Sequence, residues 1–124
     1  MKVWALILLQ MFRLLVHRPA IALALILLTS ESAMAEPVCV KYGSCLDLAP
    51  FECTTIQQSS FVRRVCYDAA KSYMIVKLNE TYYHYCDIGN RTVDDFEAAD
   101  SMGRFFNASI KGHFDCQTGH VPSY

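Results

Sequence analysis

Six cysteines, all of them between positions 39 and 116, constrain the fold of this 124-residue chain more than any other feature. An even number of cysteines in an exported segment of under ~100 residues is typical of a disulfide-stapled domain, because so small a core contributes little stability. The spacings do not match the paired Cys-x-x-Cys of a zinc ribbon or the single Cys-x-x-Cys of a thioredoxin-like site. We therefore expect three disulfides, and the sequence alone leaves their connectivity open. The cysteines are Cys39, Cys45, Cys53, Cys66, Cys86 and Cys116.

The first 35 residues predict a secretory signal peptide. Their two apolar runs, 3–9 and 20–28, are separated by basic residues, and neither approaches the ~20 apolar residues that a transmembrane helix needs. The small-x-small sequence Ala33-Met34-Ala35 follows a polar stretch, which predicts cleavage after Ala35. Met11 is a possible true start, because it gives a leader of more usual length. The alternative is an uncleaved N-terminal membrane anchor.

Residues 36–124 are the expected mature protein, and their charge balance is acidic. They carry eight Lys or Arg and eleven Asp or Glu, a formal net charge of −3, and they hold every cysteine and every tyrosine. We expect a secreted or periplasmic protein with an envelope or extracellular partner that the sequence does not identify. Contact with the membrane is expected only through the signal segment before cleavage.

Strand patterns followed by helix patterns predict an α+β fold. Residues 61–67, 73–78 and 81–86 are rich in β-branched and aromatic side chains and are joined by short links, which predicts a three-stranded antiparallel meander. An irregular Cys-rich N-terminal arm is expected at 36–54 and a tail at 115–124. The predicted order of elements is β-β-β-α-α, stapled by disulfides.

Two short helices are expected after the sheet. Val93 and Phe96 recur at helical spacing, with Asn90 or Thr92 as the expected cap. Ser101 can begin the second helix, in which Phe106 and Ile110 lie four positions apart, and Gly112 is expected to end it.

Alternation of side chains along the strands predicts the face that each cysteine occupies. Two helices cover only one face of such a sheet. If they cover the face that holds Tyr83 and Tyr85, then Cys66 and Cys86 point to the opposite face. Each of these two is expected to bond one cysteine from a flanking segment, and the remaining pair closes a local loop. The flanking cysteines are Cys53 and Cys116, and the local pair is Cys39 and Cys45.

Three motifs in the mature chain resemble those of the KTSC family, which is named after the C-terminus of some lysyl-tRNA synthetases. The stretch 59–68 is similar to the family's Ser-Ser-x-Ile-x-x-Val-x-Tyr-Asp opening, and Tyr83-His84-Tyr85 resembles its central Tyr-x-Tyr. The stretch 99–114 is similar to its closing Ala-x-Ser-x-Gly and Phe-Asn-x-x-Ile-Lys patterns.

The resemblance covers residues 55–114 and implies a compact β-β-β-α-α domain of unknown activity, with RNA binding suggested by the attachment to a synthetase. It singles out motif residues that are either structural or ligand-facing: Ser59, Ser60, Tyr67, Asp68, Tyr83, Tyr85, Ser101, Gly103, Asn107 and Ile110. We expect Ser101 and Asn107 to make buried bonds from side chain to backbone at the helix junction.

The acidic balance argues against nucleic-acid binding, because affinity for a phosphate backbone requires positive charge. A single-stranded nucleic-acid binder, with Tyr83 and Tyr85 stacking on bases, is the alternative function; we expect both rings to lie in the core instead. The leading expectation is a binding or structural module without catalysis.

No combination of residues in the sequence predicts an active site or a metal site. Ser59 or Ser60, His84 and Asp87 supply the residue types of a nucleophile, a base and an orienting acid, but no nucleophile-elbow glycines flank the serines. Three disulfides leave no free thiolate, and the remaining histidines have no metal-ligand spacing. We expect His84 to be an ordinary solvated side chain, and we expect no cofactor.

Overall fold

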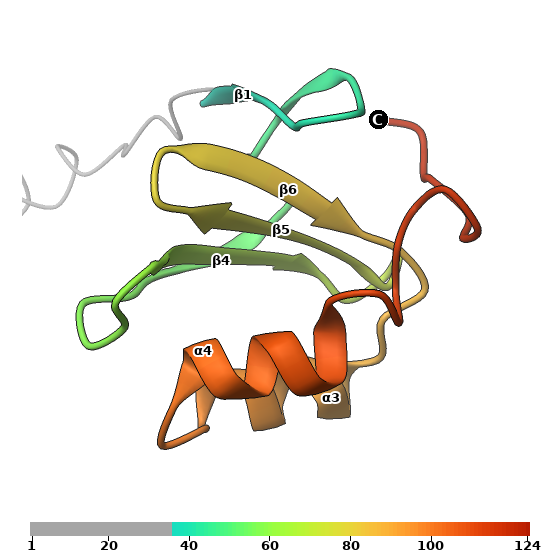
Figure 1. The fold of residues 1–124 in the computed structure, drawn as a ribbon. Coiled ribbons are helices and arrows are strands. Elements are labelled where there is room, and N and C mark those ends of the chain that lie inside the picture. The colour runs from blue at the N-terminus through green and yellow to red at the C-terminus, as the bar shows by residue number, and fades with distance from the viewer. Residues whose placement is uncertain (1–35) are drawn as a thin grey trace, which may run out of the picture. The chain divides into compact units, whose positions relative to one another are not determined.

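The computed structural model describes residues 36–124, which form one compact unit (Figure 1). The strands and helices follow one another as strands first and helices last, as expected. They are β1 (Pro37–Cys39), β2 (Cys45–Asp47), β3 (Glu52–Thr55), β4 (Val62–Asp68), β5 (Tyr73–Leu78), β6 (Thr81–Tyr85), α3 (Asn90–Glu97), α4 (Met102–Phe105) and the π-helix η2 (Phe106–Ile110). The predicted signal peptide and the alternative start at Met11 lie outside the described residues. No helix within 36–124 is long and apolar enough to cross a membrane.

The main sheet has four antiparallel strands in the order β3-β4-β5-β6, and β1 pairs with β2 in a separate hairpin. The α+β class is confirmed, but the expectation of a three-stranded sheet is wrong, as is that of an irregular arm at 36–54. The arm supplies three short strands. The fourth strand of the sheet, β3, is exposed along its whole length, so it shows no apolar alternation, and its place depends on backbone pairing with β4.

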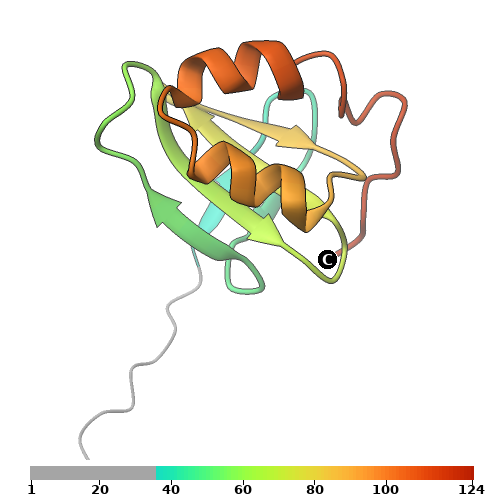
Figure 2. The same cartoon turned by 90° about the horizontal axis from the view of Figure 1, so that it is seen from below.

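One face of the main sheet is covered by helices, as Figure 2 shows from the helix side. We call it the helix-covered face. Apolar side chains of β4, β5 and β6 meet those of α3, α4 and η2 in a single cluster, in which Phe96 and Ile110 are fully buried. Tyr85 lies in this cluster and Tyr83 packs against it, which confirms the predicted side for both tyrosines.

The opposite face is covered by the arm and the tail, without a helix (Figure 1). We call it the stapled face. Its cluster contains Cys66, Tyr73 and Ile75 of the sheet and Cys86, which directly follows β6. These side chains pack against four apolar side chains of the arm, and Cys116 of the tail packs against the cluster. Those arm residues are Val38, Val40, Leu48 and Phe51.

The three disulfides follow the predicted rule. Cys53 bonds Cys66, and Cys86 bonds Cys116, so each flanking segment is tied to one cysteine on the stapled face. Cys39 bonds Cys45 directly opposite it in the β1–β2 hairpin. No cysteine within 36–124 is free.

The helix start differs from the expected one. Gly89 is the N-cap of α3, with extended backbone (φ −76°, ψ 156°), and Asn90 is already the first helical residue. The chain therefore enters the helix without a side-chain cap. Ser101 does cap α4, because its hydroxyl accepts a hydrogen bond from the Arg104 N–H at 3.4 Å, and Gly112 follows η2 in the left-handed region at φ 79°.

Candidate functional site

The exposed edge of β6 is occupied at both ends and open between them. At one end the Lys41 N–H donates to the Tyr82 carbonyl at 2.8 Å. At the other, the Cys86 N–H donates to the Phe114 carbonyl, also at 2.8 Å. Because alternate residues of an edge strand direct their backbone groups outward, His84 faces the stretch between these two contacts.

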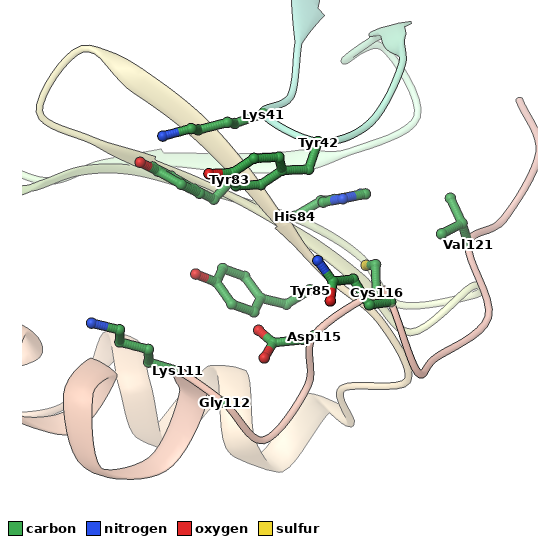
Figure 3. A pocket seen from close by; sticks show the side chains of 11 residues that line it. Lys41, Tyr42, Tyr83, His84, Tyr85, Lys111, Gly112, Asp115, Cys116 and Val121 are labelled. Carbon is green, nitrogen blue, oxygen red and sulfur yellow. The ribbon is translucent and has the colours of Figure 1, made fainter.

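A groove of about 460 Å³ lies against this stretch (Figure 3). We call it the edge groove. Its volume is in the range of small-molecule sites, which is ~300–1,000 Å³. The arm, β6, the segment after η2 and the tail all contribute to it. Its lining residues are Lys41, Tyr42, Tyr83, His84, Tyr85, Lys111, Gly112, Asp115, Cys116, Gln117 and Val121.

Hydrogen-bond donors gather at one side of the edge groove. Figure 3 shows the ammonium groups of Lys41 and Lys111 and the hydroxyls of Tyr83 and Tyr85 pointing the same way. The Lys41 ammonium lies 5.1 Å from the Tyr42 ring centre and 5.6 Å from that of Tyr83, which holds its charge against an aromatic wall. Two cations from opposite walls and two phenols provide a surface suited to a negatively charged group.

The pKa values of Lys41 and Tyr85 are both raised, so both side chains keep the protons that they donate. The Tyr42 side chain, and after it Tyr83, raises the pKa of Lys41, so this amine stays protonated in neutral solution. Burial, followed by the nearby Asp115 carboxylate, raises the pKa of Tyr85, so its phenol keeps its proton. Asp115 is the only carboxylate among the lining residues, and its backbone forms a β-bridge with Tyr85.

His84 is not the solvated side chain that we expected. Its Nδ1 lies 2.8 Å from the buried Tyr73 hydroxyl, and the two rings meet edge to face at 5.9 Å. Burial lowers the pKa of His84, which favours the neutral ring. A side chain at position 43 would also contact this ring, because a Cβ on Gly43 would lie 2.9 Å from His84 Cε1. His84 is therefore part of the wall between the arm and the sheet.

A second hollow of about 390 Å³ shares Tyr83, Tyr85 and Lys111 with the edge groove. Asn107 lines it and is exposed, so the expectation that Asn107 makes a buried bond is wrong. Within the π-helix only Phe106 and Ile110 are buried, which leaves Asn107 on the outer surface.

The remaining motif residues have structural contacts. The Tyr67 hydroxyl lies 2.8 Å from the Ile88 carbonyl, to which it donates, and 2.9 Å from Asn90 Oδ1. Ser59 Oγ accepts from the Val62 N–H at 3.1 Å, at the entry to β4. Asp68 is buried and accepts from the Tyr124 hydroxyl at 3.0 Å.

Two more motif residues belong to helix packing, and Ser60 is at the surface. A Cβ on Gly103 would lie 2.6 Å from Phe61 Cε1, so a glycine allows α4 to approach this ring. Ile110 is completely buried. Ser60 is exposed, and its carbonyl accepts from Arg63. Of the predicted motif residues, the edge groove brings together Tyr83 and Tyr85 alone.

The three residues considered as a nucleophile, a base and an orienting acid do not contact one another, because each bonds a different partner. Ser59 Oγ accepts from a backbone N–H, the His84 ring pairs with Tyr73, and Asp87 accepts from the His120 N–H at 2.9 Å. Within residues 36–124 no group of three His, Cys, Asp or Glu side chains is placed to hold a metal ion.

Sequence reasoning missed Lys41, Tyr42 and Lys111 as groove residues. Lys41 and Tyr42 were hidden in the arm, whose path across the β6 edge depends on long-range pairing. Lys111 belongs to the closing motif. The only local signal for its position was the following Gly112, which predicts that the helix ends there and that Lys111 lies at the surface.

Comparison with known proteins agrees with the resemblance seen in the motifs. The KTSC domain family model matches residues 58–114, and no curated protein sequence matches the chain. The crystal structure of a KTSC domain protein from Yersinia pestis is similar, with 29% identity and a TM-score of 0.49 over 52% of this chain and 90% of that one. Residues 58–114 of this chain are a KTSC domain.

Proposed function

We propose that this protein is an exported, non-catalytic binding module, and that the edge groove takes a small ligand with an anionic group and a flat apolar body. The observation that carries the proposal is the pair of ammonium groups, Lys41 and Lys111, on either side of the tyrosine-lined groove. Aromatic walls with a few charged groups are typical of small-molecule sites.

Export is supported by the disulfides and by the predicted leader. Three disulfides within 89 residues suggest an oxidising compartment, because cytosolic proteins seldom keep structural disulfides. The leader at 1–35 with its Ala33-Met34-Ala35 site is the proposed route, and a secreted or periplasmic location the proposed destination.

The anionic preference is a property of the groove and not of the whole protein. The mature segment has a net charge of −3, so an anion gains no attraction from the global field. The attraction is local, and it depends on Lys41 and Lys111 outweighing Asp115 at close range. This opposition predicts weak affinity for simple anions and a strong dependence on each lysine.

The absence of catalysis is part of the proposal. The groove contains His84, but Nδ1 of this ring lies 2.8 Å from the buried Tyr73 hydroxyl, and the lining residues include no serine, no threonine and no free cysteine. Ser59 and Ser60, the two serines considered as a nucleophile, are not among the lining residues. A binding role accounts for the groove without a reaction.

Benzoate, benzamide and benzamidine test the proposal, because they share a ring and differ in charge. We expect benzoate to shift the amide resonances of Tyr83, His84 and Gly112 in NMR titrations, with millimolar affinity, and benzamide to bind at least about five-fold more weakly. Benzamidine, which is positively charged, is expected not to bind. Equal affinity for all three probes would overturn the anionic preference.

Charge-removal variants locate the binding site. We expect Lys41→Gln and Lys111→Gln each to weaken benzoate binding about three- to ten-fold, while the control Arg91→Gln, an exposed cation on α3, leaves it unchanged. A single-stranded oligo-uridine is titrated in parallel at low salt. Salt-dependent binding of the oligonucleotide, with no response to benzoate, would favour the nucleic-acid alternative. The burial of Tyr85 argues against that alternative, because it leaves only the Tyr83 ring for stacking on a base.

A further inference from the structure

Glu36, the first residue after the predicted cleavage site, is held at three points. Its carboxylate forms a two-pronged ion pair with the Arg64 guanidinium, whose Nη2 lies 3.0 Å from Oε2. Its carbonyl accepts from the Leu48 N–H at 3.1 Å, and its own N–H donates to Asp47 Oδ1 at 3.2 Å. Every polar group of this exposed residue has a partner in the folded domain.

Two independent observations therefore select the same peptide bond. The sequence places cleavage after Ala35 from its small-x-small pattern. The fold places the backbone nitrogen of the next residue against a carboxylate, on the hairpin formed by β1 and β2, where Pro37 stands opposite Asp47. An amide N–H at that position carries no charge, but a newly formed N-terminus would.

We propose that Asp47 is a receptor for the mature N-terminus: cleavage of the Ala35–Glu36 bond produces an α-ammonium group on Glu36 that pairs with the Asp47 carboxylate and fastens the open end of the β1–β2 hairpin, which the Glu36 side chain ties to Arg64 of β4. The cleavage consumes one water molecule, leaving a carboxylate on Ala35 and an ammonium on Glu36. The agent is a leader-removing peptidase. The inference rests on the export part of the proposed function, and it is independent of the ligand.

The charges around Glu36 favour this change. Before cleavage the Glu36 carboxylate pairs with one cation, Arg64 of β4, and lies close enough to the Asp47 carboxylate to be repelled by it. Their mutual repulsion is visible in the pKa of Glu36, which Arg64 lowers and Asp47 opposes. An added ammonium brings the cluster to two positive and two negative groups, and it turns a hydrogen bond in which only the acceptor is charged into an ion pair. After Glu36, the Tyr82 side chain of β6 also raises the pKa of Arg64, so Arg64 keeps its charge.

Asp47 is suited to the task because it is already oriented. Its Oδ1 also accepts from the Ala49 N–H at 2.9 Å, which fixes the carboxylate in the turn after β2. An ammonium can thus be paired without ordering a second long side chain, the cost that weakens most surface ion pairs.

The full chain, expressed in a secreting host, tests the inference in two steps. Mass spectrometry of the exported product is expected to give an N-terminus at Glu36. A second chain, with one alanine inserted between Ala35 and Glu36, is expected to yield a product that begins one residue earlier, in which the Glu36 nitrogen is an amide. We expect the melting temperature of the Glu36 product to be about 3 °C higher at about pH 6.

The charge dependence separates a receptor from a merely structural carboxylate. The difference between the two products is expected to vanish at about pH 10, where an α-amino group is deprotonated. It is also expected to vanish in an Asp47→Asn background and to persist in the control Asp95→Asn, an exposed acid of α3. The comparison of products with native Asp47 does not depend on the variant folding.

Each outcome bears on a different claim. A Glu36 N-terminus with the expected pH-dependent difference supports the receptor. A Glu36 N-terminus with equal melting temperatures at about pH 6 overturns the receptor and leaves export intact. An N-terminus at any other residue overturns the receptor as well. Retention of the uncleaved chain in the cell overturns export itself, and with it the inference.

Discussion

The two faces of the main sheet are closed in different ways. The helix-covered face is closed by close packing of α3, α4 and η2, and its cluster contains no cysteine. The stapled face is closed by short segments without a helix. Two disulfides hold these segments in place: Cys53–Cys66 ties β3 to β4, and Cys86–Cys116 ties the tail to the end of β6. Short irregular covers bury less apolar area per residue than amphipathic helices, so they need a further constraint to remain in place.

The segments that cover the stapled face lie outside the residues matched by the KTSC family model, whereas the helices that cover the other face lie inside them. Cys66 and Cys86 lie inside the matched range 58–114, and their partners Cys53 and Cys116 lie outside it. Each of these two disulfides thus connects the domain to a segment beyond one of its ends. The edge groove is formed where those two added segments approach β6, so the covering of the stapled face also creates the candidate site.

The largest effect is expected on the helix-covered face. Phe96 is fully buried and packs against the rings of Phe105 and Phe106, at 5.9 and 6.3 Å between centres. We expect Phe96→Ala to lower the free energy of unfolding by about 3–5 kcal/mol, because it removes buried contacts and leaves a cavity. Urea denaturation measures it. The neighbouring exposed Glu97→Ala is expected to change stability by less than ~0.5 kcal/mol. A loss below about 1 kcal/mol at position 96 would contradict a packing-closed face.

On the stapled face covalent ties add to the packing of the arm and tail. Cys86 and Cys116 are 30 residues apart, and their bond limits the unfolded chain more than the Cys39–Cys45 bond, which spans six. Chain entropy predicts that the double variant Cys86→Ala/Cys116→Ala loses about 3.5 kcal/mol, and Cys39→Ala/Cys45→Ala about 2 kcal/mol.

Urea denaturation of the two disulfide variants, with intact remaining bonds verified by mass spectrometry, tests the order. The reverse order would mean that the tail contributes less to the stapled face than the hairpin does. We also expect Cys86→Ala/Cys116→Ala to lose benzoate binding at Tyr83, because Cys116 holds one wall of the edge groove.

The helix-covered face was largely predictable from the sequence, and the reason is periodicity. The strands at 62–68, 73–78 and 81–85 and the stripe of Val93 and Phe96 carry their burial in local spacing. The side of Cys66 and Cys86 followed from the same alternation, which is why the disulfide rule was confirmed.

The stapled face was less predictable, because its covers have no period of their own. Strand β3 is exposed on both sides, so only pairing with β4, and the position of Cys53 opposite Cys66, fixes it. The edge groove combines Lys41 with Lys111, which are 70 positions apart in the sequence. The start of α3 at Gly89 illustrates a third limit, since backbone conformation there replaces the side-chain cap that sequence rules seek.

The tail gives a smaller test of the stapled face. The Tyr124 hydroxyl donates to the buried Asp68 carboxylate, and its ring lies 5.2 Å from that of Phe51, beneath the Lys71 ammonium. We expect Tyr124→Phe to lower the free energy of unfolding by about 1 kcal/mol, because Asp68 loses a partner. Tyr42→Phe is expected to have no effect on stability, because Tyr42 is 79% exposed.

Alkaline titration checks the same contact. Burial and the Asp68 carboxylate raise the pKa of Tyr124, so the folded protein favours the protonated phenol. The stability that it contributes is complete below about pH 10 and is lost as the pH rises through the raised folded value. Tyr124→Phe is expected to reduce this alkaline loss. An unchanged alkaline profile would mean that the tail does not hold Tyr124 on Asp68 in solution.

Acidification is expected to have the smallest effect, and it acts where the arm meets β6. Burial lowers the pKa of His84 below its ordinary value of 6.5, so the folded state favours the neutral ring that pairs with Tyr73. In this pH range the unfolded chain binds more protons. The stability contributed by neutral His84 is therefore complete above about pH 6.5 and is lost as the pH falls through the lowered folded value.

We expect this loss to be at most about 0.5 kcal/mol, because water screens a half-exposed ring. Urea denaturation at about pH 7.5 and about pH 5 measures it in the native protein and in His84→Asn, which keeps a polar atom near the position of Nδ1. His113→Asn, at an exposed site after η2, is the control and is expected to keep the native pH dependence. If His84→Asn also kept the native pH dependence, the His84–Tyr73 contact would not contribute to the stability of the stapled face. The packing of Gly43 and Val40 would then be what holds this wall of the edge groove.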